Sequence, residues 1–142
     1  APAHHPLNAI DRPPARLLES FPLVVRENGS GTRAAMEHFL RAGRVTPPIT
    51  MEMSSNETIK QAVIAGMGLG FLSLHTVGLE VRSGLLHVLT IEGTPVMRTW
   101  NLVHLLAKIL SPAAEAFRYF VLEEAEAFLQ AHDAPLLNPP PR

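Results

Sequence analysis

The sequence predicts an α/β fold built on a mostly parallel sheet, and three observations support this. Short apolar runs alternate with stretches of helical periodicity along the 142 residues. Serines stand at the start of two helical stretches, each of which follows a predicted strand. Apolar residues make up 46% of the chain, which is ordinary for a globular protein. Strands that alternate with helices need crossover connections, and these connections place the strands parallel.

The first half of the chain is predicted to contain a linker followed by strand–helix pairs. Four prolines interrupt residues 1–20, which leaves room for a single helical turn at 15–20. A strand at 21–26 leads into a helix at 31–42, whose apolar residues recur with helical spacing. A second strand follows at 49–53, and another helical stretch comes after it.

Polar residues and glycines mark where these helices begin and end. Ser30 is the expected N-cap of the first helix, and Gly43 is its expected stop. The second helix is expected to begin at Ser55 or Asn56 and to end at the glycines of "GMGLG". Lys60 and the glutamine after it mark the polar side of this helix.

The second half is predicted to continue the alternation and to end in one long amphipathic helix. The expected elements are a buried strand at 69–72, a short helix or turn at 75–82, strands at 85–91 and 98–106, and a helix that opens at Ser111-Pro112. Serine followed by proline is typical of an N-cap and a first helical position. Phe117, Phe120 and Phe128 then form an apolar stripe on the long helix.

Composition and charge exclude several classes of function for this chain. The formal net charge is -1, so no strong basic field is available for direct nucleic-acid binding. The absence of cysteine removes disulfides and thiolate chemistry, and it fits a reducing compartment. No apolar run approaches the roughly 20 residues that cross a bilayer. No signal peptide is recognisable in residues 1–20, and the proline-rich residues 133–142 are expected to be a disordered tail.

The sequence contains no convincing catalytic, metal or dinucleotide motif. Aspartate occurs only at Asp11 and Asp133, near the two ends, and no GxSxG motif is present. The seven histidines lack the spacing of metal sites, although His75 follows a predicted strand and is a candidate ligand contact. The glycines at 66–70 follow a helix and precede a strand, which is the reverse of a dinucleotide fingerprint. We therefore expect no enzymatic activity, no metal and no cofactor.

The loop "NGSGTR" is the first candidate binding site, because it follows a strand and opens a helix. The first N–H groups of a helix have no partner within it, and the helix dipole makes that end partly positive. Ser30 and Thr32 add hydroxyl groups, the glycines open the backbone, and Arg33 offers a forked pair to a carboxylate or phosphate. The alternative is a capped helix with an exposed arginine.

The segment "SSNETIK" repeats this arrangement after the next strand. Ser54, Ser55 and Asn56 offer donors to an anion at a second helix start. The alternative is again a simple cap, with Glu52 and Glu57 exposed to solvent. Two such loops at the carboxyl ends of successive parallel strands favour a site, since ligands bind at that edge of open α/β sheets.

The order of motifs resembles the effector-binding domain of LysR-type transcriptional regulators, over about residues 1–122. The segments that carry the resemblance are "GSGTR", "SNETIKQAV", "AGMGLGFLS" and the closing "LSPAAEAF". Within that family the chain looks most similar to the branch that controls carbon-fixation (RuBisCO) operons.

This resemblance implies a fold like that of type 2 periplasmic binding proteins, with a complete second subdomain and a partial first subdomain. The implied domains are a crossover from the first subdomain at 1–20, the second regulatory subdomain at 21–95, a return strand and C-terminal helix at 96–132, and the tail at 133–142. The winged helix-turn-helix of the family is missing from this sequence. Missing strands would leave an apolar surface uncovered, so self-association is expected.

The resemblance also implies a cleft between subdomains that binds a small anionic effector, such as a phosphorylated metabolite. The residues carried over to that cleft are Arg26, Asn28, Ser30, Gly31, Thr32, Arg33, Ser54, Ser55, Asn56, Ser73 and His75. A proline is common in the family where Ser73 stands.

The implied partners are further copies of the chain, in a dimer or tetramer, and DNA and RNA polymerase through the full-length protein only. The implied location is the cytoplasm, with no membrane partner. The alternative is a fragment of a periplasmic-type solute-binding protein or of an enzyme with a similar fold.

Overall fold

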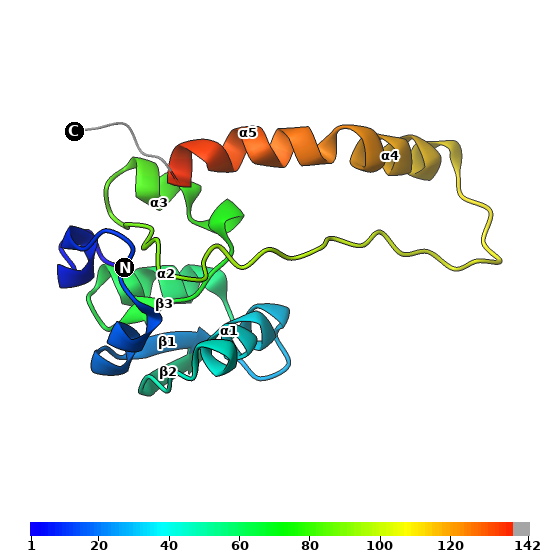
Figure 1. The fold of residues 1–142 in the computed structure, drawn as a ribbon. Coiled ribbons are helices and arrows are strands. Elements are labelled where there is room, and N and C mark those ends of the chain that lie inside the picture. Colours follow the sequence, from blue (N-terminus) through cyan, green and yellow to red (C-terminus); the bar gives the residue numbers. More distant parts are fainter. Residues whose placement is uncertain (138–142) are drawn as a thin grey trace. The chain divides into compact units, whose positions relative to one another are not determined.

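The computed structural model describes residues 1–137, which fall into two units (Figure 1). The first unit, residues 1–96, contains β1 (Leu23–Arg26), α1 (Gly31–Gly43), β2 (Ile49–Met53), α2 (Asn56–Ile64), β3 (Leu69–Gly70) and α3 (Gly78–Arg82), with 3-10 turns at Pro6–Ala9, Ala15–Ser20 and Leu74–Thr76. The second unit begins at Met97 and contains α4 (Pro112–Glu123) and α5 (Ala125–Leu137).

The three strands form one parallel sheet in the order β2-β1-β3, which confirms the predicted α/β fold with its crossover helices. Leu23 of the central strand pairs with Ile49 on one side and with Leu69 on the other. At the opposite end of β1, Arg26 pairs with Met53. The carboxyl ends of β1 and β2 therefore lie side by side.

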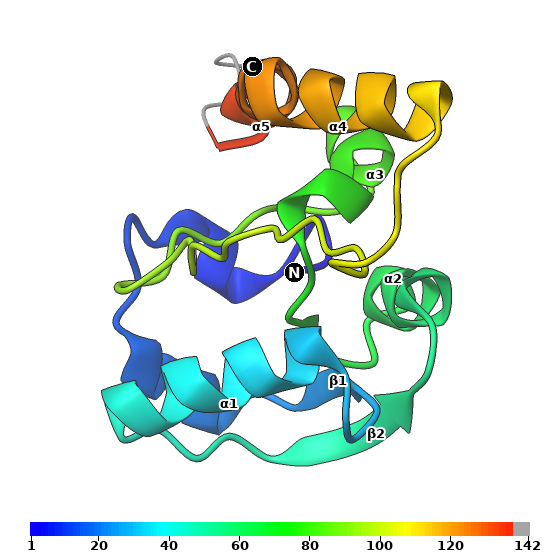
Figure 2. The same ribbon diagram turned by 90° about the vertical axis from the view of Figure 1, so that its right-hand side faces the viewer.

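Helices cover both faces of β1, because successive side chains of a strand point to opposite faces. Val25 belongs to a cluster with Met36 of α1, whereas Val24 belongs to a cluster with Ile59 of α2. The two helices lie on different sides of β1 (Figure 2). Val24, Val25 and Ile59 are fully buried. Burying a side chain of this size stabilises a fold by about 1.5–3 kcal/mol.

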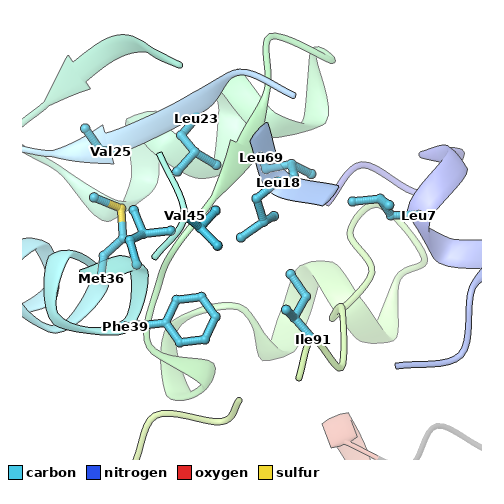
Figure 3. Packing of buried hydrophobic residues seen from close by; sticks show 10 residues of the cluster. Leu7, Leu18, Leu23, Val25, Met36, Phe39, Val45, Leu69 and Ile91 are labelled. Atoms are coloured by element: carbon cyan, nitrogen blue, oxygen red, sulfur yellow. The ribbon is translucent and has the colours of Figure 1, made fainter. Parts of the chain in front are cut away.

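The first twenty residues pack into the core of the first unit. The predicted turn at 15–20 is confirmed as Ala15–Ser20. Its Leu18 and the earlier Leu7 lie in the same buried cluster as Phe39 of α1 and Ile91 (Figure 3). The segment that connects to β1 therefore contributes to the stability of the sheet.

The N-caps are as predicted, but the end of α1 is not. Ser30 caps α1 and Ser55 caps α2. Gly43 is still helical, and it is Arg44 that adopts the left-handed conformation with φ of 53°. The next residue, Val45, is buried, and its N–H donates to the carbonyl oxygen of Leu40. Packing of Val45 therefore sets the end of the helix, rather than the glycine.

Two predicted strands are wrong. The segment at 85–91 forms only one isolated bridge, between Leu86 and Pro2, and β3 is also shorter than predicted. The segment at 98–106 forms no strand, and its residues are exposed. A strand needs a neighbour to accept and donate its backbone hydrogen bonds. In the described part of the chain, the three strands of the sheet pair with one another and none pairs with 98–106.

The predicted long C-terminal helix is two helices. Ser111 caps α4 as expected, but α4 ends at Glu123, and Glu124 is its C-cap with φ of −119° and ψ of −23°. Over residues 112–131 no side chain is buried, so local interactions, such as the Ser111 cap and the Glu115–Arg118 ion pair, hold this region helical. The expected disordered tail is also partly wrong, because α5 continues through 133–137. The rest of the tail lies outside the described residues.

Lys60 does not lie on an exposed polar side of α2, as the sequence pattern suggested. The residue is 5% exposed. Its Nζ lies 2.7 Å from Oε1 of Glu80 on α3 and 2.7 Å from Oε1 of Glu57. A buried ammonium group needs a paired carboxylate, and Glu80 supplies it from a distant part of the sequence.

Candidate anion-binding site at the carboxyl edge of the sheet

Three loops follow the carboxyl ends of the three parallel strands. Residues 27–30 connect β1 to α1, residues 54–55 connect β2 to α2, and residues 71–73 follow β3. Because all three strands run in the same direction, these loops share one edge of the sheet. This is the edge at which open α/β sheets bind ligands.

The first loop is a tight turn that ends in a capped helix. The N–H of Ser30 donates to the carbonyl oxygen of Glu27 at 3.2 Å, and Oγ of Ser30 accepts from the N–H of Thr32 at 3.2 Å. Gly29 has φ of +88°, a conformation that favours glycine, and open space surrounds its Cα. Asn28 is exposed. The turn therefore leaves the start of α1 open to solvent.

The second loop has the same construction. Oγ of Ser55 accepts from the N–H of Glu57 at 3.2 Å, and the carbonyl oxygen of Ser55 accepts from Oγ1 of Thr58 at 2.9 Å. Ser54 is exposed ahead of the cap. Both helices thus begin with a serine that satisfies one backbone donor and leaves the others of the first turn available.

Arg26 links the two helix starts. Its Nη1 donates to Oδ1 of Asn56 at 2.7 Å, which ties the last residue of β1 to the first residue of α2. Its Nε and Nη2 donate to the two carboxylate oxygens of Glu27 at 2.7 and 2.8 Å. The N–H of Glu27 in turn donates to the carbonyl oxygen of Met53 at 3.1 Å. The two loops that the sequence assigned to one site therefore meet at Arg26.

Arg33 reaches back from α1 toward the same edge. Its Nη1 donates to the carbonyl oxygen of Arg26 at 3.0 Å and lies 3.4 Å from Oε2 of Glu52 on β2. Its Nε donates to Glu37 at 2.6 Å, one turn along the helix. The side chain is only 14% exposed. Arg33 therefore connects α1, β1 and β2 through its polar contacts and is not a freely exposed arginine.

Ser73 and His75 lie beyond β3, on the side of β1 opposite to β2. The carbonyl oxygen of Ser73 accepts from the N–H and from Oγ1 of Thr76, which closes the 3-10 turn. His75 is exposed within that turn. In the residues described, the hydrogen bonds that join the first two loops at Arg26 do not extend to Ser73.

The carboxylates of this edge are the residues that sequence reasoning missed. Glu27, Glu37 and Glu52 pair with the two arginines, and the hydrogen bond from Arg26 lowers the pKa of Glu27. Glu27 therefore stays ionised at neutral pH. Two of these ion pairs could have been predicted from the sequence, because Arg26 and Glu27 are adjacent and Arg33 and Glu37 have i,i+4 spacing on a helix. The pair with Glu52 depends on strand pairing and had no local signal.

This edge has donors for an anion and no set of residues for a metal. Backbone N–H groups at two helix starts, the serine hydroxyl groups and the carboxamide of Asn56 are all donors suited to a phosphate or carboxylate. Among the residues described, no cluster of three or more histidine, aspartate or glutamate side chains is suited to a metal ion. None of the described helices has the length and apolar character to span a membrane.

Comparison with curated proteins points to regulators of carbon fixation. The chain is 44% identical over 129 residues to the HTH-type transcriptional regulator CfxR of Cupriavidus necator, covering 91% of this chain and 41% of that protein. It is 50% identical over 132 residues to CbbR of Xanthobacter flavus, covering 91% and 39%. It is 50% identical over 128 residues to the RuBisCO operon transcriptional regulator of Allochromatium vinosum, covering 88% and 41%. The chain thus spans about two fifths of the length of these relatives.

Comparison with solved structures confirms the predicted fold. The regulatory domain of Synechocystis PCC6803 CcmR, solved in complex with 2-PG, superposes with a TM-score of 0.74 at 33% identity, covering 99% of this chain and 62% of that one. The effector binding domain of QuiR in complex with shikimate has a TM-score of 0.68 at 17% identity, covering 89% and 59%, which supports the fold alone.

The expected family and its carbon-fixation branch are therefore confirmed by the relatives, all of which are named as transcriptional regulators. Residues 1–126 match the family described as the LysR substrate binding domain. The chain belongs to the LysR substrate binding domain family.

Proposed function

We propose that this chain is the effector-binding part of a LysR-type regulator of carbon-fixation genes, and that its effector is a small phosphorylated anion. The observation that carries the proposal is the meeting of two capped helix starts at Arg26, on the carboxyl edge of a parallel sheet. The likeness to a regulatory domain solved with 2-PG supports a phosphorylated effector.

In this proposal the anion lies against the N–H groups of α1 and α2. Ser30, Gly31 and Thr32 would contact it from the first loop, and Ser54, Ser55 and Asn56 from the second. Asn28, Arg26 and Arg33 would shape the site, and Ser73 and His75 would border it beyond β3. The charge of a phosphate suits the positive ends of two helix dipoles, so no metal or cofactor is needed.

Binding acts by changing populations of two arrangements of the regulator. An effector shifts such an equilibrium only by the difference between its affinities for the two states. DNA and RNA polymerase would respond through the whole protein, in the cytoplasm. The relatives, which are named as transcriptional regulators, favour this proposal over the alternative, an enzyme or a solute-binding protein.

We propose that the protein acts as a homo-oligomer, a dimer or a tetramer. The large apolar side chains left exposed in the second unit support this, among them Trp100, Leu106 and Phe117. Light scattering should give a mass above that of one chain at micromolar concentration. A stable monomer at high concentration would contradict the oligomer.

The site is tested by calorimetric titration of the intact protein with 2-PG and a panel of other phosphorylated metabolites. We expect one or more of them to bind, and Thr32→Ala to weaken that binding about tenfold, because it removes a donor to a charged group. Thr46→Ala is the matched control, since Thr46 is an exposed threonine that precedes β2 at the opposite edge of the sheet. Equal affinity in the two variants would remove the first loop from the site, and turnover of a bound compound would favour an enzyme.

A further inference from the structure

The bidentate edge of Arg26 is already occupied. A guanidinium group has five N–H donors, and the pair Nε and Nη2 forms the fork that matches a carboxylate or phosphate. In Arg26 this fork is filled by the two oxygens of Glu27, at 2.7 and 2.8 Å. The remaining nitrogen, Nη1, donates to Asn56. An anion that seeks the fork must therefore take the place of Glu27.

The other arginine of the edge is compensated in the same way. Arg33 contacts Glu37 and Glu52, so that two arginines face three carboxylates before any ligand arrives. The local charge of the side chains therefore does not attract an anion by itself. Selectivity at this edge depends on which anion makes a better pair than the glutamates do.

Glu27 is the partner that is free to leave. Its side chain is 36% exposed and belongs to the turn before α1, whereas the side chain of Arg26 is 19% exposed. If the Glu27 carboxylate rotates away from Arg26 into water, no charge becomes buried and no helix is distorted. Arg26 keeps its place after that movement, because the hydrogen bond to Asn56 at 2.7 Å does not involve Glu27.

We propose that Glu27 sets the affinity of this site, as an internal carboxylate that competes with the effector for Arg26; this rests on the proposed function. Exchange of Glu27 for a ligand carboxylate replaces one singly charged pair by another and gains little. Exchange for a phosphate gains charge and a third acceptor oxygen, since a phosphate monoester carries about −1.5 to −2 at neutral pH. Glu27 therefore lowers the affinity of the site for every anion that uses the fork, and the stronger pair made by a phosphate overcomes this cost where a lone carboxylate does not.

The test compares two substitutions that change the charge equally in the intact protein. Glu27→Gln removes the competing carboxylate and keeps the size of the side chain. Glu115→Gln removes a carboxylate that pairs with Arg118 on α4, in the other unit. The probes are 2-PG, inorganic phosphate and acetate, each titrated by calorimetry. Melting curves of both variants establish that they are folded.

We expect Glu27→Gln to bind 2-PG and phosphate about two- to fivefold more tightly than the unaltered protein does, the range set by loss of one exposed ion pair. The affinity for acetate should rise by the same factor, because displacing Glu27 costs every such anion the same, while Glu115→Gln leaves all three affinities unchanged. Glu27→Asp has a side chain too short to fill both donors of the fork, so it should give a smaller gain in affinity.

If Glu27→Gln matches Glu115→Gln or binds more weakly, the competitor role is wrong although the site stands. If the unaltered protein binds neither phosphate probe, the proposed function fails as well.

Discussion

The helices of the two units are capped in the same way, but the two units differ widely in how far their apolar side chains are buried. The helices α1, α2 and α4 each begin with a serine whose hydroxyl accepts a backbone N–H of the first turn. In the first unit Ile59 is fully buried, whereas Ile109 of the second unit is 95% exposed and Leu106 is 99% exposed. A cap fixes where a helix begins, but only burial against another element gives a unit its stability.

The largest expected difference between the units is the cost of removing an isoleucine. We predict that Ile59→Ala destabilises the 142-residue chain by about 4 kcal/mol, in the upper half of the range for a fully buried site. Ile59 of α2 lies in a buried cluster with Val24 of β1, Val77 and Leu86, so the cavity touches several segments. Urea denaturation followed by circular dichroism measures the loss.

Ile109→Ala is the matched control, the same chemical change in the other unit. An exposed side chain contributes little, so we expect a change within about 0.5 kcal/mol. A large loss of stability at Ile109 would mean that residues 97–110 are covered in solution, and the contrast between the units would not hold.

A smaller difference is expected between the ion pairs of the two units. Lys60 and Glu80 have side chains that are 7% and 10% exposed, whereas Arg118 and Glu115 are 31% and 40% exposed. We predict that Lys60→Met costs about 3 kcal/mol, because it leaves the charge of Glu80 buried without a partner. Arg118→Met should cost less than about 1 kcal/mol. Adding Glu80→Leu to Lys60→Met should recover most of the stability, which a double-mutant cycle by urea denaturation would measure.

The same pair predicts a dependence of stability on pH. Its hydrogen bond with Lys60 lowers the pKa of Glu80 below the ordinary 4.5, so its contribution is present above pH 4.5 and is lost as the pH falls through the lower folded value. Hydrogen bonds with Glu57 and then Glu80 raise the pKa of Lys60 above 10.5, so its contribution is present below that pH and is lost as the pH rises further. The double variant Lys60→Met, Glu80→Leu should lose stability less steeply in acid and in base than the unaltered chain.

Local signals explain what the sequence predicted well. Ser30 was predicted as a cap, and the second cap was narrowed to Ser55 or Asn56, because capping involves residues only two positions away. The bounds of β2 at 49–53 followed from an apolar run between prolines and serines. The parallel direction of the strands followed from alternation alone, since crossover connections allow few other arrangements.

Non-local pairing explains what could not be predicted. The strands expected at 85–91 and 98–106 have suitable residues, but no pattern in a single segment states whether a partner exists. The contact between Arg26 and Asn56 spans 30 positions and depends on the register of β1 against β2. Glu80 pairs with Lys60 across two elements, so a lysine in a helical pattern was assigned to the wrong side of α2.

The smallest expected difference concerns the caps themselves. We predict that Ser30→Ala lowers the global stability of the chain by about 1 kcal/mol, because α1 unfolds together with the core of which Met36 and Phe39 are part. Ser111→Ala removes an equivalent hydrogen bond, 3.3 Å from the Ser111 oxygen to the N–H of Ala114. Since α4 buries no side chain, that substitution should lower helix content without moving the main unfolding transition. Circular dichroism reports helix content and the transition midpoint in one experiment. Equal shifts of the midpoint in both variants would show that the second unit unfolds cooperatively with the first. Side chains of residues 97–131 would then have to be buried in solution, and the contrast between the two units would not hold.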